Sequence, residues 1–98
     1  MNNPPSSLDA GLHAIADPTR RRILGALKQH HRSSEKSTGM CAGDIEECVQ
    51  LSQPTISHHM AVLTKSGLVE ATRQGQWRRY RRNEKALRRL VKSLRAQL

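Results

Sequence analysis

Two short amphipathic segments separated by a tight turn constrain the fold of this chain more than any other feature. Residues 42–49 and residues 53–65 carry apolar side chains at helical spacing, and only residues 50–52 separate them. Ser52 is a favourable N-cap for the second segment, and Gly67 follows it as a stop signal. The pattern therefore predicts two helices joined by a three-residue turn.

Two more helices are predicted upstream of this pair. A short helix follows Ser7, and a second helix has Asp17 as its N-cap and Pro18 as its first helical residue. The polar, Ser-rich residues 30–39 show no periodicity and are interpreted as a loop. Residues 1–7 are predicted to form a flexible N-terminal arm.

Downstream of the pair, the sequence predicts a β-hairpin and a last helix. Residues 68–82 have the character of two strands around a turn at Gln74 and Gly75, and residues 84–98 have one apolar stripe at helical spacing. A helix-turn-helix followed by a hairpin and flanked by helices is a winged helix-turn-helix. We therefore predict a mainly α fold with a β-hairpin wing, formed by a single domain over residues 8–98.

The apolar stripes of the first and last helices predict a homodimer. Apolar residues make up 36% of the 98 residues and Phe is absent, so one domain of this size has a thin core. The two outer helices nevertheless present more apolar surface than that core can cover. We assign seven of their residues to a dimer interface: Leu8, Leu12, Ile15, Leu87, Leu90, Val91 and Leu94.

The charge of the chain points to a polyanionic partner. The net charge is +9, and from Arg73 onward there are ten Lys or Arg but one acid, Glu84. Nucleic acid is the first candidate, and an anionic membrane surface is the second. No run of 18 apolar residues is present, and the opening residues lack the pattern of a signal peptide, so we expect a cytoplasmic protein with reduced cysteines.

The helix over residues 53–65 has an outward face suited to DNA. On a helical wheel, Ile56, Met60 and Leu63 lie on one side, whereas Ser57 and His58 lie on the other. Small side chains that form hydrogen bonds fit a major groove about 12 Å wide and can contact base edges there. The alternative is that these two residues are only solvated.

The order of the motifs resembles that of the ArsR/SmtB family of bacterial winged-helix repressors. The residues that carry the resemblance are "DPTRRRIL" from Asp17 and "LSQPTISHHMAVLTKSGLV" from Leu51. The resemblance implies a homodimeric repressor on an inverted-repeat double-stranded DNA operator, with an inducer that is a soft metal ion in many members. Carried over by position, the DNA contacts fall on the helix and the wing: Gln53, Thr55, Ser57, His58, Arg73, Gln74, Gly75, Gln76, Arg78 and Arg79.

The second wing strand departs from the family pattern. One face of it carries Arg78, Tyr80 and Arg82, where the family commonly places inward apolar residues. Only Tyr80 has the character of a core residue. Either the arginines extend their charged ends to solvent, or the strand is short.

The family's metal-binding residues are incomplete in this chain. Where the family has "CVCDL", this sequence has "CAGDI", so that Cys41 matches the first ligand and Gly43 replaces the second. The last helix holds Glu84 but no histidine, which argues against the family's zinc site. We therefore predict no metal. The first interpretation of Cys41 and Cys48 is that both are small core residues beside Ile45, and the alternative is that Cys41 is a sensing thiol.

Three other functions are weighed against a regulator. Catalysis by Ser57 and His58 is excluded because adjacent helical residues point about 100° apart and no carboxylate accompanies them. A sequence-neutral architectural protein for DNA or RNA is the main alternative. A peripheral membrane protein using the amphipathic last helix is the third possibility.

Overall fold

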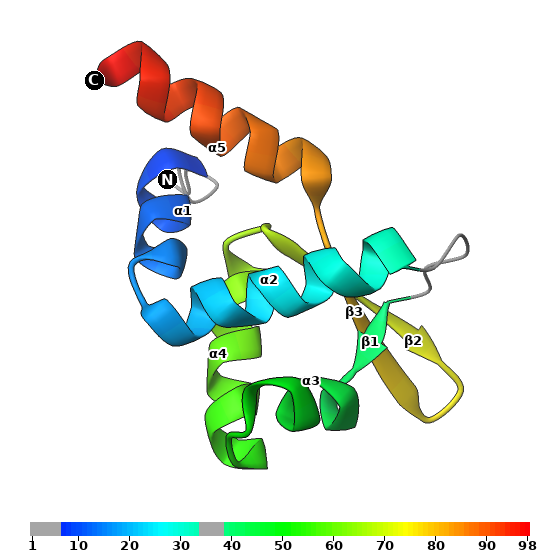
Figure 1. Ribbon diagram of the computed structural model, residues 1–98. Helices are drawn as coiled ribbons and strands as arrows, with labels where there is room; N and C mark the ends of the chain where they lie inside the picture. Colours follow the sequence, from blue (N-terminus) through cyan, green and yellow to red (C-terminus); the bar gives the residue numbers. More distant parts are fainter. Residues whose placement is uncertain (1–6, 34–38) are drawn as a thin grey trace, which may run out of the picture.

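The computed structural model describes residues 7–33 and 39–98, which form five helices and three strands (Figure 1). In chain order the elements are α1 (Ser7–Ile15), α2 (Pro18–Ser33), β1 (Met40–Cys41), α3 (Ala42–Val49), α4 (Gln53–Lys65), β2 (Val69–Gln74), β3 (Trp77–Arg82) and α5 (Glu84–Gln97). The predicted arm lies outside the described residues except for Ser7, which is the first residue of α1.

The start of α2 confirms the predicted N-cap. The Asp17 carboxylate accepts a hydrogen bond from the backbone N–H of Arg20 at 3.0 Å, and Pro18 is the first helical residue. The far end of α2 corrects a prediction, because residues 30–33 are helical rather than part of a loop. This last turn is polar, so no apolar periodicity marked it in the sequence.

The two central helices have the predicted bounds. α3 ends at Val49, and Gln50 then adopts a left-handed backbone conformation with φ of 56°, its N–H donating to the Glu46 carbonyl at 2.7 Å. Arg22 of α2 donates to the Val49 carbonyl at 3.1 Å, which attaches the end of α3 to α2. These contacts fix where the turn begins, and Ser52 then stands at the N-cap of α4.

The wing is part of a three-stranded antiparallel sheet in the order β1-β3-β2. The predicted hairpin is confirmed, but its turn lies at residues 75–76, one residue later than predicted, because Gln74 pairs with Trp77. The short strand β1 was not predicted. It runs so close to β3 that a Cβ on Gly39, which has φ of +93°, would lie 2.5 Å from the Tyr80 carbonyl oxygen.

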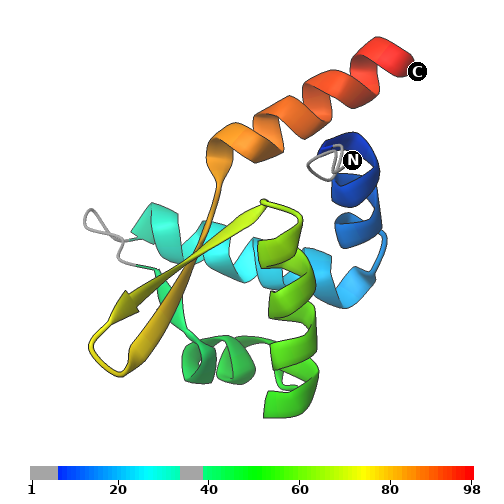
Figure 2. The same cartoon turned by 180° about the vertical axis from the view of Figure 1, so that it is seen from behind.

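The core lies where α2, α3, α4 and the base of the sheet meet. Side chains from each of these elements are almost fully buried there, and they include Ile23, Leu27, Ile45, Val49, Ile56, Met60, Leu63, Val69 and Tyr80. α3, α4 and the tip of the hairpin lie toward one end of the molecule, and α1 and α5 lie toward the other (Figures 1 and 2). The candidate DNA-binding elements are thus separated from the candidate dimer helices.

The apolar residues of α1 and α5 are divided between the chain's own core and its surface. Leu90 was assigned to the dimer interface, but it is buried against Gly11 of α1 within the same chain. It is therefore not at the surface for a partner subunit, and this assignment is wrong. Leu12 and Val91 are exposed, whereas the remaining members of the set, Leu8, Ile15, Leu87 and Leu94, are half-buried. None of the helices in the described ranges is long and apolar enough to cross a bilayer.

Candidate nucleic-acid interface

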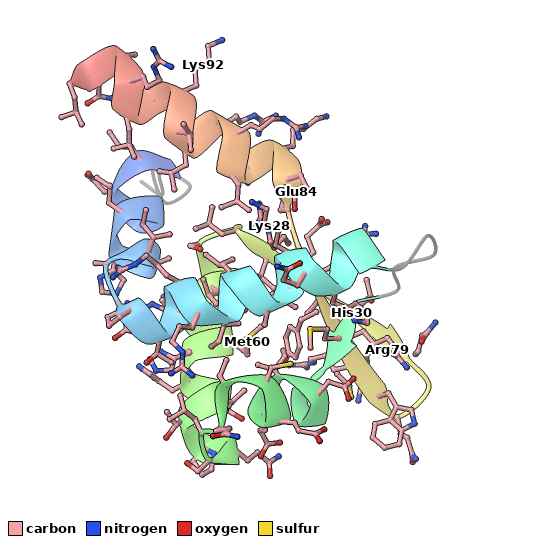
Figure 3. The ribbon with its side chains drawn as sticks, in the orientation of Figure 1. Lys28, His30, Met60, Arg79, Glu84 and Lys92 are labelled. Carbon is pink, nitrogen blue, oxygen red and sulfur yellow. The ribbon has the colours of Figure 1, made fainter. Side chains whose placement is uncertain are left out.

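The two sides of α4 have the orientation that the helical wheel predicted. Ile56 and Met60 point into the core, with Met60 directed toward the centre of the molecule in Figure 3. Ser57 and His58 are exposed, as are Gln53, Pro54, Ala61 and Lys65. Thr55 is half-buried, and its hydroxyl lies 3.0 Å from the Ser52 hydroxyl. The outward face is therefore polar and free of acidic groups.

The strand register divides the hairpin into two faces. Residues paired directly across an antiparallel ladder point to the same side, and the side alternates along each strand. Tyr80 is buried and pairs with Ala71. The pair of Arg73 and Arg78 is two positions closer to the hairpin tip on each strand, so it lies on the same face as Tyr80. This face is turned toward α4.

A hollow of about 400 Å³ lies between α4 and the hairpin. Its α4 side includes Ser57, Ala61 and Lys65, and its hairpin side includes Arg78 and Tyr80. The hollow therefore brings two cations, Lys65 and Arg78, from separate elements to one place. That combination suits a phosphate group, which accepts hydrogen bonds and carries negative charge.

The pairing of Arg73 with Arg78 has no structural benefit. Like charges directly opposite each other in a sheet are destabilising. The register places these two guanidinium-bearing residues opposite each other, and no carboxylate of the described residues pairs with either. An external anion would relieve the repulsion, so this pair is the strongest electrostatic indication of a ligand surface.

The other wing arginines are occupied within the chain. Arg79, which is labelled in Figure 3, lies on the opposite face of β3. Its Nε donates to Gln74 at 2.9 Å, and its Nη1 donates to the Gly39 carbonyl at 3.3 Å. Arg81 lies 3.8 Å from Glu70. Of the predicted wing contacts, Arg79 and Gln74 are thus bonded to each other, whereas Arg73 and Arg78 are not.

The alternative of a short wing strand is wrong. β3 spans six residues, from Trp77 to Arg82. Arg82 is only 16% exposed and its Nε lies 2.9 Å from Glu84 at the start of α5, so a carboxylate neutralises it where the strand meets the core. The sequence did not reveal this ion pair as the reason for an arginine on the inward face.

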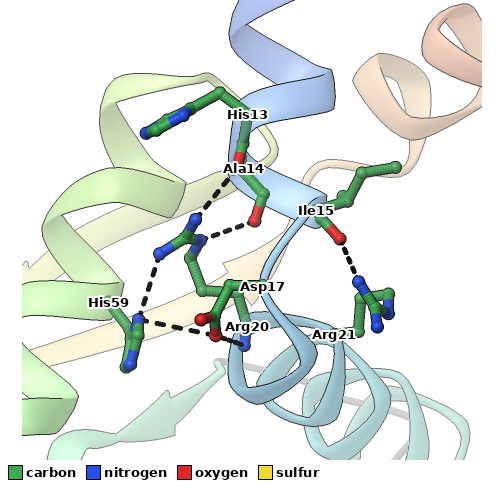
Figure 4. A network of polar contacts seen from close by, with 7 residues as sticks. All are labelled: His13, Ala14, Ile15, Asp17, Arg20, Arg21 and His59. Carbon is green, nitrogen blue, oxygen red and sulfur yellow. Dashed lines mark hydrogen bonds and ion pairs between the residues drawn. The ribbon is translucent and has the colours of Figure 1, made fainter.

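A polar network lies beneath α4 and joins it to α1 and α2 (Figure 4). Arg20 is 7% exposed, and its Nε and Nη2 donate to the carbonyls of Ala14 and His13 at 2.6 and 2.9 Å. Its Nη1 lies 3.3 Å from Nδ1 of His59 on α4. Because a guanidinium can only donate, Nδ1 must be the acceptor and the neutral imidazole carries its proton on Nε2.

The same network shifts two pKa values. Burial lowers the pKa of His59, whose side chain is 12% exposed, although nearby Asp17 acts in the opposite direction. The Arg20 backbone N–H lowers the pKa of Asp17, with smaller contributions from the charges of His59 and Arg20. His59 is therefore neutral at pH 7 and serves as a buried acceptor, not as a DNA contact. Its neighbour His58 is exposed.

Comparison with known proteins identifies the family. A family of proteins described as a helix-turn-helix domain matches residues 15–72. The transcriptional repressor SdpR of Bacillus subtilis is 40% identical over 74 residues, which cover 76% of this chain and 73% of SdpR. An arsenical resistance operon repressor of Staphylococcus xylosus is 38% identical over 77 residues, which cover 78% of this chain and 65% of that protein. The chain belongs to the ArsR/SmtB family of winged helix-turn-helix repressors. The predictions of family, fold class and DNA-binding transcriptional regulation are confirmed.

Solved structures of similar fold agree with the ArsR/SmtB assignment. An ArsR-like transcriptional regulator from Rhodococcus has a TM-score of 0.77 at 25% identity, with 93% of this chain and 78% of that chain covered. HlyU from Vibrio cholerae has a similar fold, with a TM-score of 0.67 at 27% identity, and the match covers 96% of this chain and 97% of the HlyU chain. The ArsR/SmtB proteins to which the chain is similar are regulators, not enzymes.

The cysteines of this ArsR/SmtB chain do not lie in the core. Cys41 is the half-buried residue before α3, and its Sγ donates to Asp44 at 3.1 Å. Cys48 is exposed, which contradicts the core interpretation, because Ile45 and Val49 form the buried side of α3. In residues 7–33 and 39–98, no three His, Cys, Asp or Glu side chains gather into a group that could hold a metal ion.

Two histidines outside α4 lie on the helices that precede it. The backbone carbonyl of His13 takes part in the Arg20 network, whereas its side chain is exposed. His30 belongs to the last turns of α2 rather than to the predicted loop. The sequence misplaced His30 because the polar end of α2 carries no apolar periodicity.

Proposed function

We propose that this protein represses transcription as a homodimer on an inverted-repeat operator. In each half-site α4 lies in the major groove, and the hairpin lies over the adjacent sugar-phosphate backbone. The observation that carries this proposal is the unrelieved pair of Arg73 and Arg78, of which Arg78 lines the hollow beside α4. A DNA phosphate in that hollow would be within reach of both Lys65 and Arg78.

The outward face of α4 provides the sequence-specific contacts in this proposal. Ser57 and His58 are exposed near the middle of α4 and are positioned for base edges. Gln53 and Thr55 belong to its first turn, where unpaired N–H groups favour a phosphate. At the wing, Arg73 and Arg78 contact phosphate, whereas Gly75 and Gln76 form the turn that approaches the DNA.

The dimer forms through α1 and α5. Leu12 and Val91 are exposed there, and Val91 and Leu87 line an open groove on α5 of about 570 Å³ with a rim of cations. A related winged helix-turn-helix domain from Mycobacterium bovis, with a TM-score of 0.71 at 24% identity, is described as homodimeric. The two α4 helices of such a dimer would reach half-sites about one helical turn of DNA apart.

The experiment that tests the interface is the salt dependence of DNA binding. Genomic fragments bound by the protein are selected first, and the affinity for the recovered duplex is then measured across a range of salt concentrations. Each phosphate contact contributes about 0.9 to the slope of log K against log [salt], so Arg78→Ala, which removes two contacts per dimer, should flatten the slope by about 2.

The matched control is Arg89→Ala, which removes one positive charge per chain from an exposed position of α5 outside the groove proposed for the dimer. This control should leave the slope unchanged. Equal effects of Arg78→Ala and Arg89→Ala would show that net charge alone drives binding. That result would favour the sequence-neutral architectural alternative.

The inducer is proposed to act without a resident metal, with Cys41 as the candidate thiol. Cys41 directly precedes α3, so a modification there would disturb the helix that supports α4. Operator affinity is compared for the wild type, Cys41→Ser and Cys48→Ser, each with zinc, arsenite and a mild oxidant. Release of the wild type by zinc would contradict the metal-independent proposal, and equal oxidant responses in all three proteins would exclude Cys41.

A further inference from the structure

Trp77 is a large apolar side chain exposed at the tip of the wing. It is the only Trp in the sequence, and it is 60% exposed. The other large hydrophobic residues exposed in the described parts of the chain are Leu12, Val91 and Leu98, which lie on α1 or at α5. A dimer through those helices would therefore leave the Trp77 indole uncovered.

The strand register places Trp77 beyond the arginine pair. Trp77 is the first residue of β3 and pairs with Gln74 across the turn at residues 75–76. Because side chains alternate along a strand, the indole lies on the face opposite to Arg73 and Arg78. One face of the wing tip thus carries two unpaired cations, and the other carries an exposed aromatic ring.

This arrangement matches the order of features across a DNA duplex. When α4 lies in the major groove and the hollow beside Arg78 holds a backbone phosphate, the far face of the hairpin lies over the next groove, which is the minor groove. We propose that Trp77 enters that minor groove and forms an apolar DNA contact beside each half-site. This proposal rests on the function proposed above.

The chemistry of an indole suits that position. Its ring can pack against the sugars that line the groove, and its N–H can donate to the adenine N3 and thymine O2 acceptors on the groove floor. Apolar side chains that enter the minor groove are a recurrent device of DNA-binding proteins. Arg79 and Gln74 are hydrogen-bonded to each other at 2.9 Å on the same face, which holds the neighbours of the indole in place.

The test uses Trp77 as its own probe, because no other Trp contributes to the emission. The recovered operator duplex is titrated into the wild type while Trp emission and the anisotropy of labelled DNA are both recorded. The proposal predicts that emission changes in parallel with anisotropy. It also predicts tighter binding to a duplex whose flanking base pairs are A·T than to one whose flanks are G·C.

Variants separate this contact from the rest of the interface. Trp77→Ala should weaken operator binding by about tenfold, because the partial burial of a large apolar side chain is lost, and it should reduce the preference for A·T flanks. Leu98→Ala, which shortens another exposed apolar side chain, should change neither. If Trp77→Ala bound the operator with wild-type affinity, or if Trp emission did not change when the operator bound, the role proposed for Trp77 would be overturned and the proposed function would stand. Absence of any anisotropy change would overturn the proposed function as well.

Discussion

Arg20→Met is predicted to destabilise the fold, although Arg20 lies on the buried side of α2 with Ile23 and Leu27, where an apolar side chain would normally be favourable. The substitution keeps an unbranched apolar side chain but removes the guanidinium that bonds the carbonyls of Ala14 and His13 and faces His59. Ala14 is fully buried, so its carbonyl would lose a charged donor with no water to replace it. The attachment of α1 to α2 and α4 should weaken accordingly.

The magnitude follows from two opposing effects. A hydrogen bond from a charged donor contributes roughly 1.5–3 kcal/mol, and two strong ones are lost to the α1 carbonyls. Against this, the variant no longer has to desolvate a guanidinium, which returns a few kcal/mol. The lost bonds outweigh the regained desolvation because two acceptors remain unpaired, and we expect a net loss of about 2–4 kcal/mol. Domains of this size have a stability of about 5–15 kcal/mol.

Urea unfolding followed by circular dichroism measures this loss. The midpoint should fall by about 1–2 M at a fixed protomer concentration, which must be held constant for a dimer. Arg21→Met is the matched control, because exposed Arg21 donates to the neighbouring Ile15 carbonyl at the same end of α1. Equal midpoints for the two variants would refute the reasoning, since solvent can replace the donor only at the exposed site.

Three further predictions concern acidity, association and the sheet. Because the pKa of His59 is lowered in the fold, the free energy of unfolding should decline as pH falls below about 6.5. The pKa of Asp17 is also lowered, so a second decline should follow below its ordinary pKa of 3.8. Urea midpoints measured against pH would show the decline below 6.5, and His59→Gln should abolish it. Val91→Asp should raise the dimer dissociation constant by roughly tenfold or more, measured by sedimentation. Leu98→Asp, at the fully exposed end of α5, should raise it less. A wild type that is monomeric at micromolar concentration would contradict the proposed dimer. Gly39→Ala should lower the stability by more than about 1 kcal/mol, because its Cβ would collide with the Tyr80 carbonyl, and an unchanged urea midpoint would contradict this.

The helices could be predicted from the sequence where caps and periodicity agree. Asp17 before Pro18 marked the start of α2. Ser52 and Gly67 marked the ends of α4, and the apolar spacing of its residues gave its orientation. The hairpin followed from its composition and its glycine turn. These signals are local, because each depends on residues within one or two turns of the chain.

Features that depend on distant residues could not be predicted. β1 is two residues long and exists only because Gly39 allows the backbone to approach Tyr80. The network of Arg20 joins residues 13, 14 and 59, which no spacing rule connects. The same holds for Arg73 and Arg78, since a turn placed one residue earlier would have given a different pairing. The exposed Trp77 was visible in the sequence, but its face was not.

The central claim is that the outward face of α4 reads the operator, and the most direct test is the ratio of affinities for the operator and a random-sequence duplex. Ser57→Ala and His58→Ala should each lower operator affinity by about 1–3 kcal/mol and leave the affinity for the random duplex unchanged. Gln29→Ala, at an exposed position of α2 away from the proposed interface, serves as the control. If His58→Ala and Ser57→Ala both kept the wild-type ratio of operator affinity to random-duplex affinity, the assignment of α4 as the recognition helix would be contradicted.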